Sequence, residues 1–127
     1  MLLGPHNAKF SQDGNIVALS LDRNGLGCRL LTKKQFIYGR FRVSSKASPG
    51  NSAGTVTTLY VSTDVNKQKN EEIDFEFIGN VAGQPYTFHT NLYAPNVGNK
   101  EVEFQPWFDP TTSFHIYTIS WSSSMVV

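Results

Sequence analysis

Three acidic residues recur at every second position in one short segment of the chain. Glu72, Asp74 and Glu76 alternate with an isoleucine and two phenylalanines. Successive side chains of a β-strand point to opposite faces, so the three carboxylates are predicted to share one face and the apolar residues the other. A solvated strand face is the ordinary interpretation of such a pattern. Three like charges without a cation among them nevertheless indicate a chemical use.

A pair of carboxylates can cleave a glycosidic bond. Retaining glycosidases need one carboxylate as nucleophile and a second, protonated carboxyl as acid, about 5–5.5 Å apart. The backbones of Glu72 and Glu76 would lie about 13 Å apart in an ideal strand, so their side chains must lean toward each other. Asp74 lies between them and could keep Glu76 protonated while orienting Glu72. A calcium site is the weaker alternative, because no loop has the acidic spacing with glycine that binds this ion, and we predict no metal and no cofactor.

The segments that must position these carboxylates predict an all-β fold. Period-two alternation and β-branched runs predict strands over residues 17–21, 36–43, 55–61, 71–78, 86–93, 102–108 and 114–121. Turns or loops are predicted at 24–28, 49–52, 62–70 and 94–100. No segment of helical length has a period of 3.6 residues. Short strands between Gly, Pro and Asn turns indicate an antiparallel β-sandwich or barrel, in which Trp107 and Phe108 are expected to pack in the core or at a sheet edge.

Length and charge narrow the class of protein. A chain of 127 residues is one domain by default and can bury a moderate core. Its formal net charge of +1 gives no electrostatic attraction to nucleic acid or to an anionic membrane surface. No apolar run approaches the roughly 20 residues that span a bilayer. We therefore expect neither nucleic acid nor a membrane as a partner. The chain is expected to be a monomer. Cys28 is the only cysteine, so no internal disulfide can form.

Longer stretches of the sequence resemble one known family. The segment E-E-I-D-F-E-F-I-G-N at 71–80 resembles the H-D-E-I-D-F-E-F-L-G-N signature of plant xyloglucan endotransglucosylase/hydrolases, which belong to glycoside hydrolase family 16. Further matching stretches follow in family order: L-D-R-N-G at 21–25, K-K-Q-F-I-Y-G-R at 33–40, P-G-N-S-A-G-T-V-T at 49–57, P-Y-T-F-H-T-N at 85–91 and W-F-D-P-T at 107–111. The resemblance covers nearly the whole chain.

The resemblance implies a fold and a set of roles. The fold is a β jelly roll, a concanavalin-like sandwich whose concave face binds a β-1,4-glucan backbone. Position by position, Glu72 matches the nucleophile, Glu76 the general acid/base and Asp74 the helper carboxylate. Contacts to the glucan are implied for Glu76 and for two polar stretches: His89, Thr90 and Asn91, and Asn99, Lys100 and Glu101. Lys100 stands where arginine is typical, and lysine cannot make the flat bidentate contact of arginine.

The expected partner is xyloglucan or a related β-glucan, and three functions stay open. The first is an enzyme that cleaves and religates xyloglucan by retaining double displacement, with transfer, hydrolysis or both, secreted to the plant cell wall or apoplast although no signal peptide is visible. The second is an inactive relative or weak glucan-binding module, since the chain stops at Val127, about where the family's acceptor-side half would begin. Residues 1–127 are accordingly expected to be a partial catalytic domain. The third, a mixed-linkage glucanase of the same family, is disfavoured by the H-T-N and P-G-N-S-A-G-T-V stretches.

Overall fold

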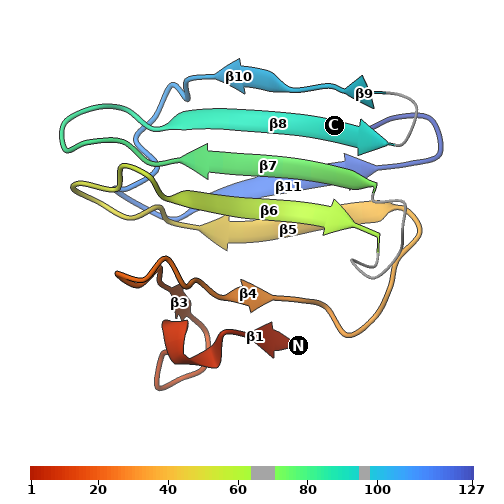
Figure 1. Cartoon of the computed structure of the whole chain (residues 1–127). Helices are drawn as coiled ribbons and strands as arrows, with labels where there is room; N and C mark the ends of the chain where they lie inside the picture. The colour runs from red at the N-terminus through yellow and green to blue at the C-terminus, as the bar shows by residue number, and fades with distance from the viewer. Residues whose placement is uncertain (64–70, 95–97) are drawn as a thin grey trace. The chain divides into compact units, whose positions relative to one another are not determined.

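The computed structural model describes residues 1–63, 71–94 and 98–127, apart from the side chains of residues 98 and 99 (Figure 1). The chain forms two compact units, residues 1–37 and residues 38–127. The carboxylates of interest lie in the second unit.

The first unit consists of two small antiparallel sheets and one 3₁₀ turn. Strand β1 (Leu2–Leu3) pairs with β4 (Arg29–Leu30), and β2 (Ala8–Phe10) pairs with β3 (Val17–Leu19), while η1 spans Pro5–Asn7. Two aspartates hold its turns. Asp13 accepts hydrogen bonds from Ser11 and Asn15, which lower its pKa to about 2. Asp22 accepts the backbone N–H groups of residues 24 and 26, at the turn predicted from the sequence.

The second unit contains a five-stranded antiparallel sheet and a two-stranded one. The larger sheet has the order β10-β8-β7-β6, and β9 pairs with the end of β8. Its strands are β6 (Val56–Ser62), β7 (Glu72–Ile78), β8 (Thr87–Ala94), β9 (Gly98–Asn99) and β10 (Val102–Phe104). The smaller sheet pairs β5 (Gly39–Ser45) with β11 (His115–Trp121), and Figure 1 shows it lying behind the larger sheet.

An aromatic core joins the two sheets of this unit. Phe77 and Phe88 of the larger sheet are 3% and 1% exposed, and Tyr117 of β11 is 7% exposed. The rings of Phe77 and Tyr117 meet edge to face with centroids 4.5 Å apart, and Phe75 packs against the same cluster. Aromatic pairs in this geometry add to the stabilisation that burial provides. The predicted all-β fold, an antiparallel sandwich of the jelly-roll class, is confirmed.

Several predicted boundaries differ from the structure for local reasons. The strand predicted to begin at residue 36 begins at Gly39, because Tyr38 has a φ of +68° and Gly39 a φ of +147°, which break the extended backbone. The strand predicted to end at residue 108 ends at Phe104, two residues before Pro106, whose nitrogen cannot donate to a sheet. Trp107 is 91% exposed, so its predicted packing in the core or at a sheet edge is wrong, whereas Phe108 is partly buried and packs against the core, as predicted. The predicted loop over 62–70 lies largely outside the described residues, and the two- and three-residue strands β1, β2, β4 and β9 were too short to show alternation.

Replacing Phe88 by alanine is expected to destabilise the second unit strongly. The side chain is 1% exposed and lies in the middle of the aromatic core, so its removal leaves a cavity that costs about 3–5 kcal/mol. The matched control, Phe114→Ala, removes a ring that is 54% exposed and should change stability by only about 0.5 kcal/mol. Urea denaturation monitored by fluorescence measures both variants. Equal losses in the two variants would contradict the packing described here.

Candidate active site

The pairing of four strands gathers polar side chains on one face of the larger sheet. Directly opposed residues of antiparallel strands share a face. Glu76 of β7 lies opposite Thr58 of β6 and opposite His89 of β8, and His89 in turn lies opposite Glu103 of β10. These four residues therefore form one row across the sheet, on the face away from the aromatic core.

Two further rows extend this polar face along β7. Asp74 lies between Tyr60 of β6 and Asn91 of β8. Glu72 lies between Ser62 and Tyr93 in the same way. The structure thus brings the three predicted carboxylates together on a central strand, bordered by hydroxyl, amide and imidazole groups. This is the composition of a surface that can bind the hydroxyl groups of a sugar chain.

A tight loop anchors the end of β7. The buried Ser52 accepts the N–H of Asn80 at 3.2 Å and donates its own backbone N–H to the Asn80 carbonyl at 2.9 Å. The N–H of Gly79 donates to the carbonyl of Thr55 at 2.9 Å. Any side chain at Gly79 would collide with the carbonyl of Ser52. These contacts require glycine at residue 79, and they fix the strand that carries the carboxylates.

Asp74 has the most perturbed environment of this face. The residue is only 8% exposed, and its Oδ1 accepts no hydrogen bond from the described residues. Burial, followed by the charges of Glu76, Glu72 and Glu101, raises the pKa of Asp74 from 3.8 to about 6. Asp74 therefore holds a proton at mildly acidic pH, at a position between the two glutamates.

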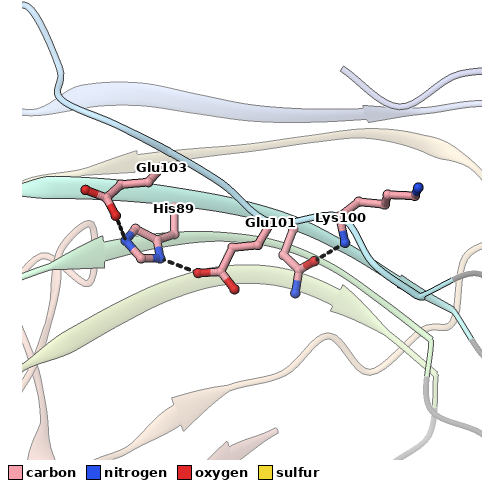
Figure 2. Close-up of polar contacts among 5 residues, drawn as sticks. His89, Lys100, Glu101 and Glu103 are labelled. Atoms are coloured by element: carbon pink, nitrogen blue, oxygen red, sulfur yellow. Dashed lines mark hydrogen bonds and ion pairs between the residues drawn. The ribbon is translucent and has the colours of Figure 1, made fainter.

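His89 lies between two carboxylates of the neighbouring segment, as Figure 2 shows. Its Nδ1 is 2.8 Å from Oε1 of Glu101, and its Nε2 is 3.5 Å from Oε2 of Glu103. The three side chains are 22%, 47% and 69% exposed, respectively. The short contact requires a proton on Nδ1, because a carboxylate oxygen only accepts.

The other sequence-predicted residues divide between the two faces. Oδ1 of Asn91 accepts the backbone N–H of Lys100 at 3.1 Å, whereas the side chain of Lys100 points away from both His89 and Glu101 (Figure 2). Thr90 lies opposite Phe75, on the core side of the sheet, so its side chain is not brought to the carboxylates. The backbone of Asn99 pairs with Tyr93, but its side chain lies outside the described residues.

One charged residue of this face was missed from the sequence. Glu103 reaches His89 from the strand β10, although only Glu101 was predicted as part of the site. The available signal was the alternation of Glu101 and Glu103 around a valine, which repeats on a small scale the pattern of β7. Alternation shows that two side chains share a face, but it does not show which strand lies beside them.

Other features of the described residues lie apart from this site. No group of three or more His, Cys, Asp or Glu residues among them could hold a metal ion. Within the same residues, no helix has the length and apolar character needed to cross a membrane. An apolar hollow of about 520 Å³, lined by Phe75, Phe88, Phe104 and Tyr117 among others, opens on the core side of the sheet. It is therefore not part of the carboxylate face.

Comparison with known proteins finds relatives whose sequences match nearly the whole of this chain. A sequence profile of Glycosyl hydrolases family 16 matches residues 1–127. Xyloglucan endotransglucosylase/hydrolase protein 22 of Arabidopsis thaliana is 43% identical over 98% of this chain and 43% of its own length. Xyloglucan endotransglucosylase proteins 7 and 8 of Diospyros kaki are 44% and 45% identical to this chain over 98% of its length. The matched regions cover 45% and 42% of the lengths of those two proteins. The chain spans less than half the length of these relatives.

Replacing Asp74 by asparagine is expected to change how stability depends on pH. Between about pH 4 and pH 6 the folded protein keeps a proton on Asp74 that the unfolded chain releases. The free energy of unfolding therefore falls as pH rises through this range. Asp74→Asn lacks this fall, so its stability relative to the unsubstituted protein should be greater at pH 7 than at pH 4.

A variant of opposite sign provides the control for this measurement. Hydrogen bonds from Thr111 lower the pKa of Asp109. Asp109→Asn should therefore have a smaller free energy of unfolding than the unsubstituted protein at pH 7, and this difference should shrink as the pH falls below 4. Urea denaturation of all three proteins from pH 3 to pH 7 gives the curves. Parallel curves for the unsubstituted protein and Asp74→Asn would show that Asp74 has an ordinary pKa.

Proposed function

The chain belongs to glycosyl hydrolase family 16, and from this we propose that it cleaves the β-1,4-glucan backbone of xyloglucan by retaining double displacement. The fragment is then joined to a second sugar chain or released to water. One observation carries the proposal: strand pairing places Glu72, Asp74 and Glu76 on one polar face, with the proton-holding Asp74 between the two glutamates. Relatives that are named for xyloglucan match this chain over nearly its full length.

In the first half of the proposed reaction, Glu72 acts as the nucleophile. A carboxylate oxygen of Glu72 forms a bond to the anomeric carbon while the bond from that carbon to the glycosidic oxygen breaks. Glu76 donates its proton to the departing oxygen, which leaves as a hydroxyl group. The product of this half is a glycosyl ester on Glu72 and an ionised Glu76.

In the second half, Glu76 acts as the base. It removes a proton from a hydroxyl group of an acceptor sugar or from water, and the resulting oxygen attacks the anomeric carbon. The ester bond to Glu72 breaks, so both glutamates return to their starting states. An acceptor sugar gives transfer, and water gives hydrolysis. Two displacements at one carbon retain its configuration. The reaction requires no metal or organic cofactor.

Asp74 is assigned the role of helper carboxyl. The sequence suggested that it could keep Glu76 protonated, whereas the raised pKa in this structure belongs to Asp74 itself. A protonated Asp74 can donate a hydrogen bond to the Glu72 carboxylate and orient it. It also separates Glu72 and Glu76 by a neutral group, which reduces the repulsion that three ionised carboxyls on one face would produce.

The substrate contacts are proposed for the residues that border the carboxylates. Glu76, His89 and Asn91 would face the sugar directly, and Glu101 would do so beside His89. Lys100 and Asn99 would contact the glucan at the end of β8, the former in place of an arginine-type contact. Thr90 would contribute through its backbone only, since its side chain lies on the core side.

The partner and the location follow from the substrate. Xyloglucan, or a closely related β-glucan, is the proposed partner, bound by a monomer with no role for nucleic acid or membrane. Xyloglucan belongs to the plant cell wall, so we place the activity outside the cell, in the wall or apoplast. Residues 1–127 would act as part of a family 16 catalytic domain.

Replacing Glu72 by glutamine should lower the rates of both transfer and hydrolysis by a factor of about 10³ or more, because the amide cannot form the glycosyl ester. Xyloglucan and a fluorescent xyloglucan oligosaccharide are incubated with the protein, and labelled polymer and reducing ends are counted separately. The matched control is Glu71→Gln, which removes an exposed carboxylate one residue away and should stay within about twofold of the unsubstituted protein.

The outcome distinguishes the remaining functions. Unsubstituted protein no more active than Glu72→Gln would contradict the catalytic proposal. If such an inactive chain still retained xyloglucan on a column, it would be a binding module. Activity on mixed-linkage glucan alone would contradict the substrate while leaving the mechanism intact.

Replacing Glu76 by glutamine should leave a reaction that azide rescues. With an aryl glycoside, whose leaving group needs little protonation, Glu72 still forms the ester, but no base remains to activate the acceptor. Azide needs no base, so it should restore turnover at least tenfold and give a β-glycosyl azide. Mass spectrometry and NMR identify that product. If azide fails to restore the turnover of Glu76→Gln, the acid/base role of Glu76 is wrong. If azide restores the turnover of Glu72→Gln instead, the roles of the two glutamates are exchanged.

A further inference from the structure

His89 lies beside the proposed acid/base, but its ring makes no polar contact with it in the described part of the chain. His89 and Glu76 are direct cross-strand partners, so their Cβ atoms are expected about 4.5–5.5 Å apart. At that separation the two side chains are within reach of each other. In the described part of the chain, neither a hydrogen bond nor an ion pair joins the imidazole to Glu76; the ring contacts Glu101 and Glu103 instead.

Both ring nitrogens of His89 are engaged on the side of β10. Nδ1 lies 2.8 Å from Glu101 in a hydrogen bond, and Nε2 lies 3.5 Å from Glu103, a contact that attracts the ring when both nitrogens carry a proton (Figure 2). Turning the imidazole toward β7 would break both contacts. Glu103 is the direct partner of His89 on β10, and the strand pairing itself sets its position.

We propose that Glu103 is a positioning residue for the acid/base: together with Glu101, it holds the His89 imidazole toward β10, so that the carboxyl of Glu76 stays available for the glycosidic oxygen. This inference rests on the proposed function of Glu76. Glu103 need not touch the substrate or the reacting atoms, since it acts through His89. Without it, the ring competes with the substrate for Glu76.

The surroundings of His89 indicate that these contacts orient its ring rather than stabilise the fold. Glu103 is 69% exposed and Glu101 is 47% exposed, and ion pairs with that exposure contribute little to folding. Glu76 is the direct partner of His89 on β7, and Asp74 lies two residues along the same face. Glu101 and Glu103 contact the ring from the β10 side, whereas the Lys100 side chain points away (Figure 2). Carboxylates on both sides compete for one imidazole, and Glu103 shifts that competition toward β10.

A double-mutant cycle tests the inference. Glu103→Gln removes the charge that faces Nε2 and should lower kcat on xyloglucan about five- to tenfold, with KM within about twofold. In a His89→Gln background the same substitution should change kcat less than twofold, because no imidazole remains to be misplaced. The melting temperature of Glu103→Gln should equal that of the unsubstituted protein. An equal loss of kcat in both backgrounds would overturn the proposal.

A second measurement does not depend on activity. In NMR spectra of the unsubstituted protein, the His89 ring protons should show nuclear Overhauser contacts to the side chains of residues 101 and 103. In Glu103→Gln the contact to residue 103 should weaken and one to Glu76 should appear. Identical contacts in both proteins would overturn the proposal. If the chain proves inactive on xyloglucan, the proposed function fails while this measurement still decides the position of the ring.

Discussion

The pairing register of β7 is the constraint on which the rest of the structure depends. Side chains of a strand alternate with a period of two, so a slip of one residue would exchange its two faces. The three carboxylates would then enter the aromatic core, and Phe75 and Phe77 would face water. Phe77 and Tyr117 oppose this slip from the core side, and the contacts of Ser52 with Asn80 oppose it at the strand end. Packing that stabilises the sandwich therefore also aligns the carboxylates.

The same register imposes an electrostatic cost on the fold. It fixes acidic side chains at every second position of the strand on one face, and no lysine lies among them. Asp74, the most buried of the three, responds by a raised pKa and holds a proton at mildly acidic pH. Perturbed carboxyls of this kind are common where a protein performs acid–base chemistry. The cost and the proposed chemistry thus arise from one arrangement.

The sequence predicted what depends on local alternation and missed what depends on neighbours. The acidic strand, its two faces and most strands of the second unit follow from residue patterns that any window of eight residues shows. The exposure of Trp107 and the backbone turn at Tyr38 depend on what packs against them, which no pattern shows. The contact between Glu103 and His89 depends on which strand lies next to β8. The location of the raised pKa on Asp74 depends on burial as well as on charge, and the sequence gives only the charges.

The strand that carries the proposed acid/base and the edge strand β10 differ in how freely they can change. On β7, Phe75 and Phe77 serve the core and three acidic residues form the polar face, so a substitution at any of these positions alters folding or chemistry directly. On β10, an edge strand of three residues, Glu103 is largely exposed and contributes little to packing. A substitution at such a position changes the charge and orientation of groups near Glu76 at small cost in stability. The edge strand is therefore where the electrostatics of this face can be adjusted without disturbing the strand that carries it.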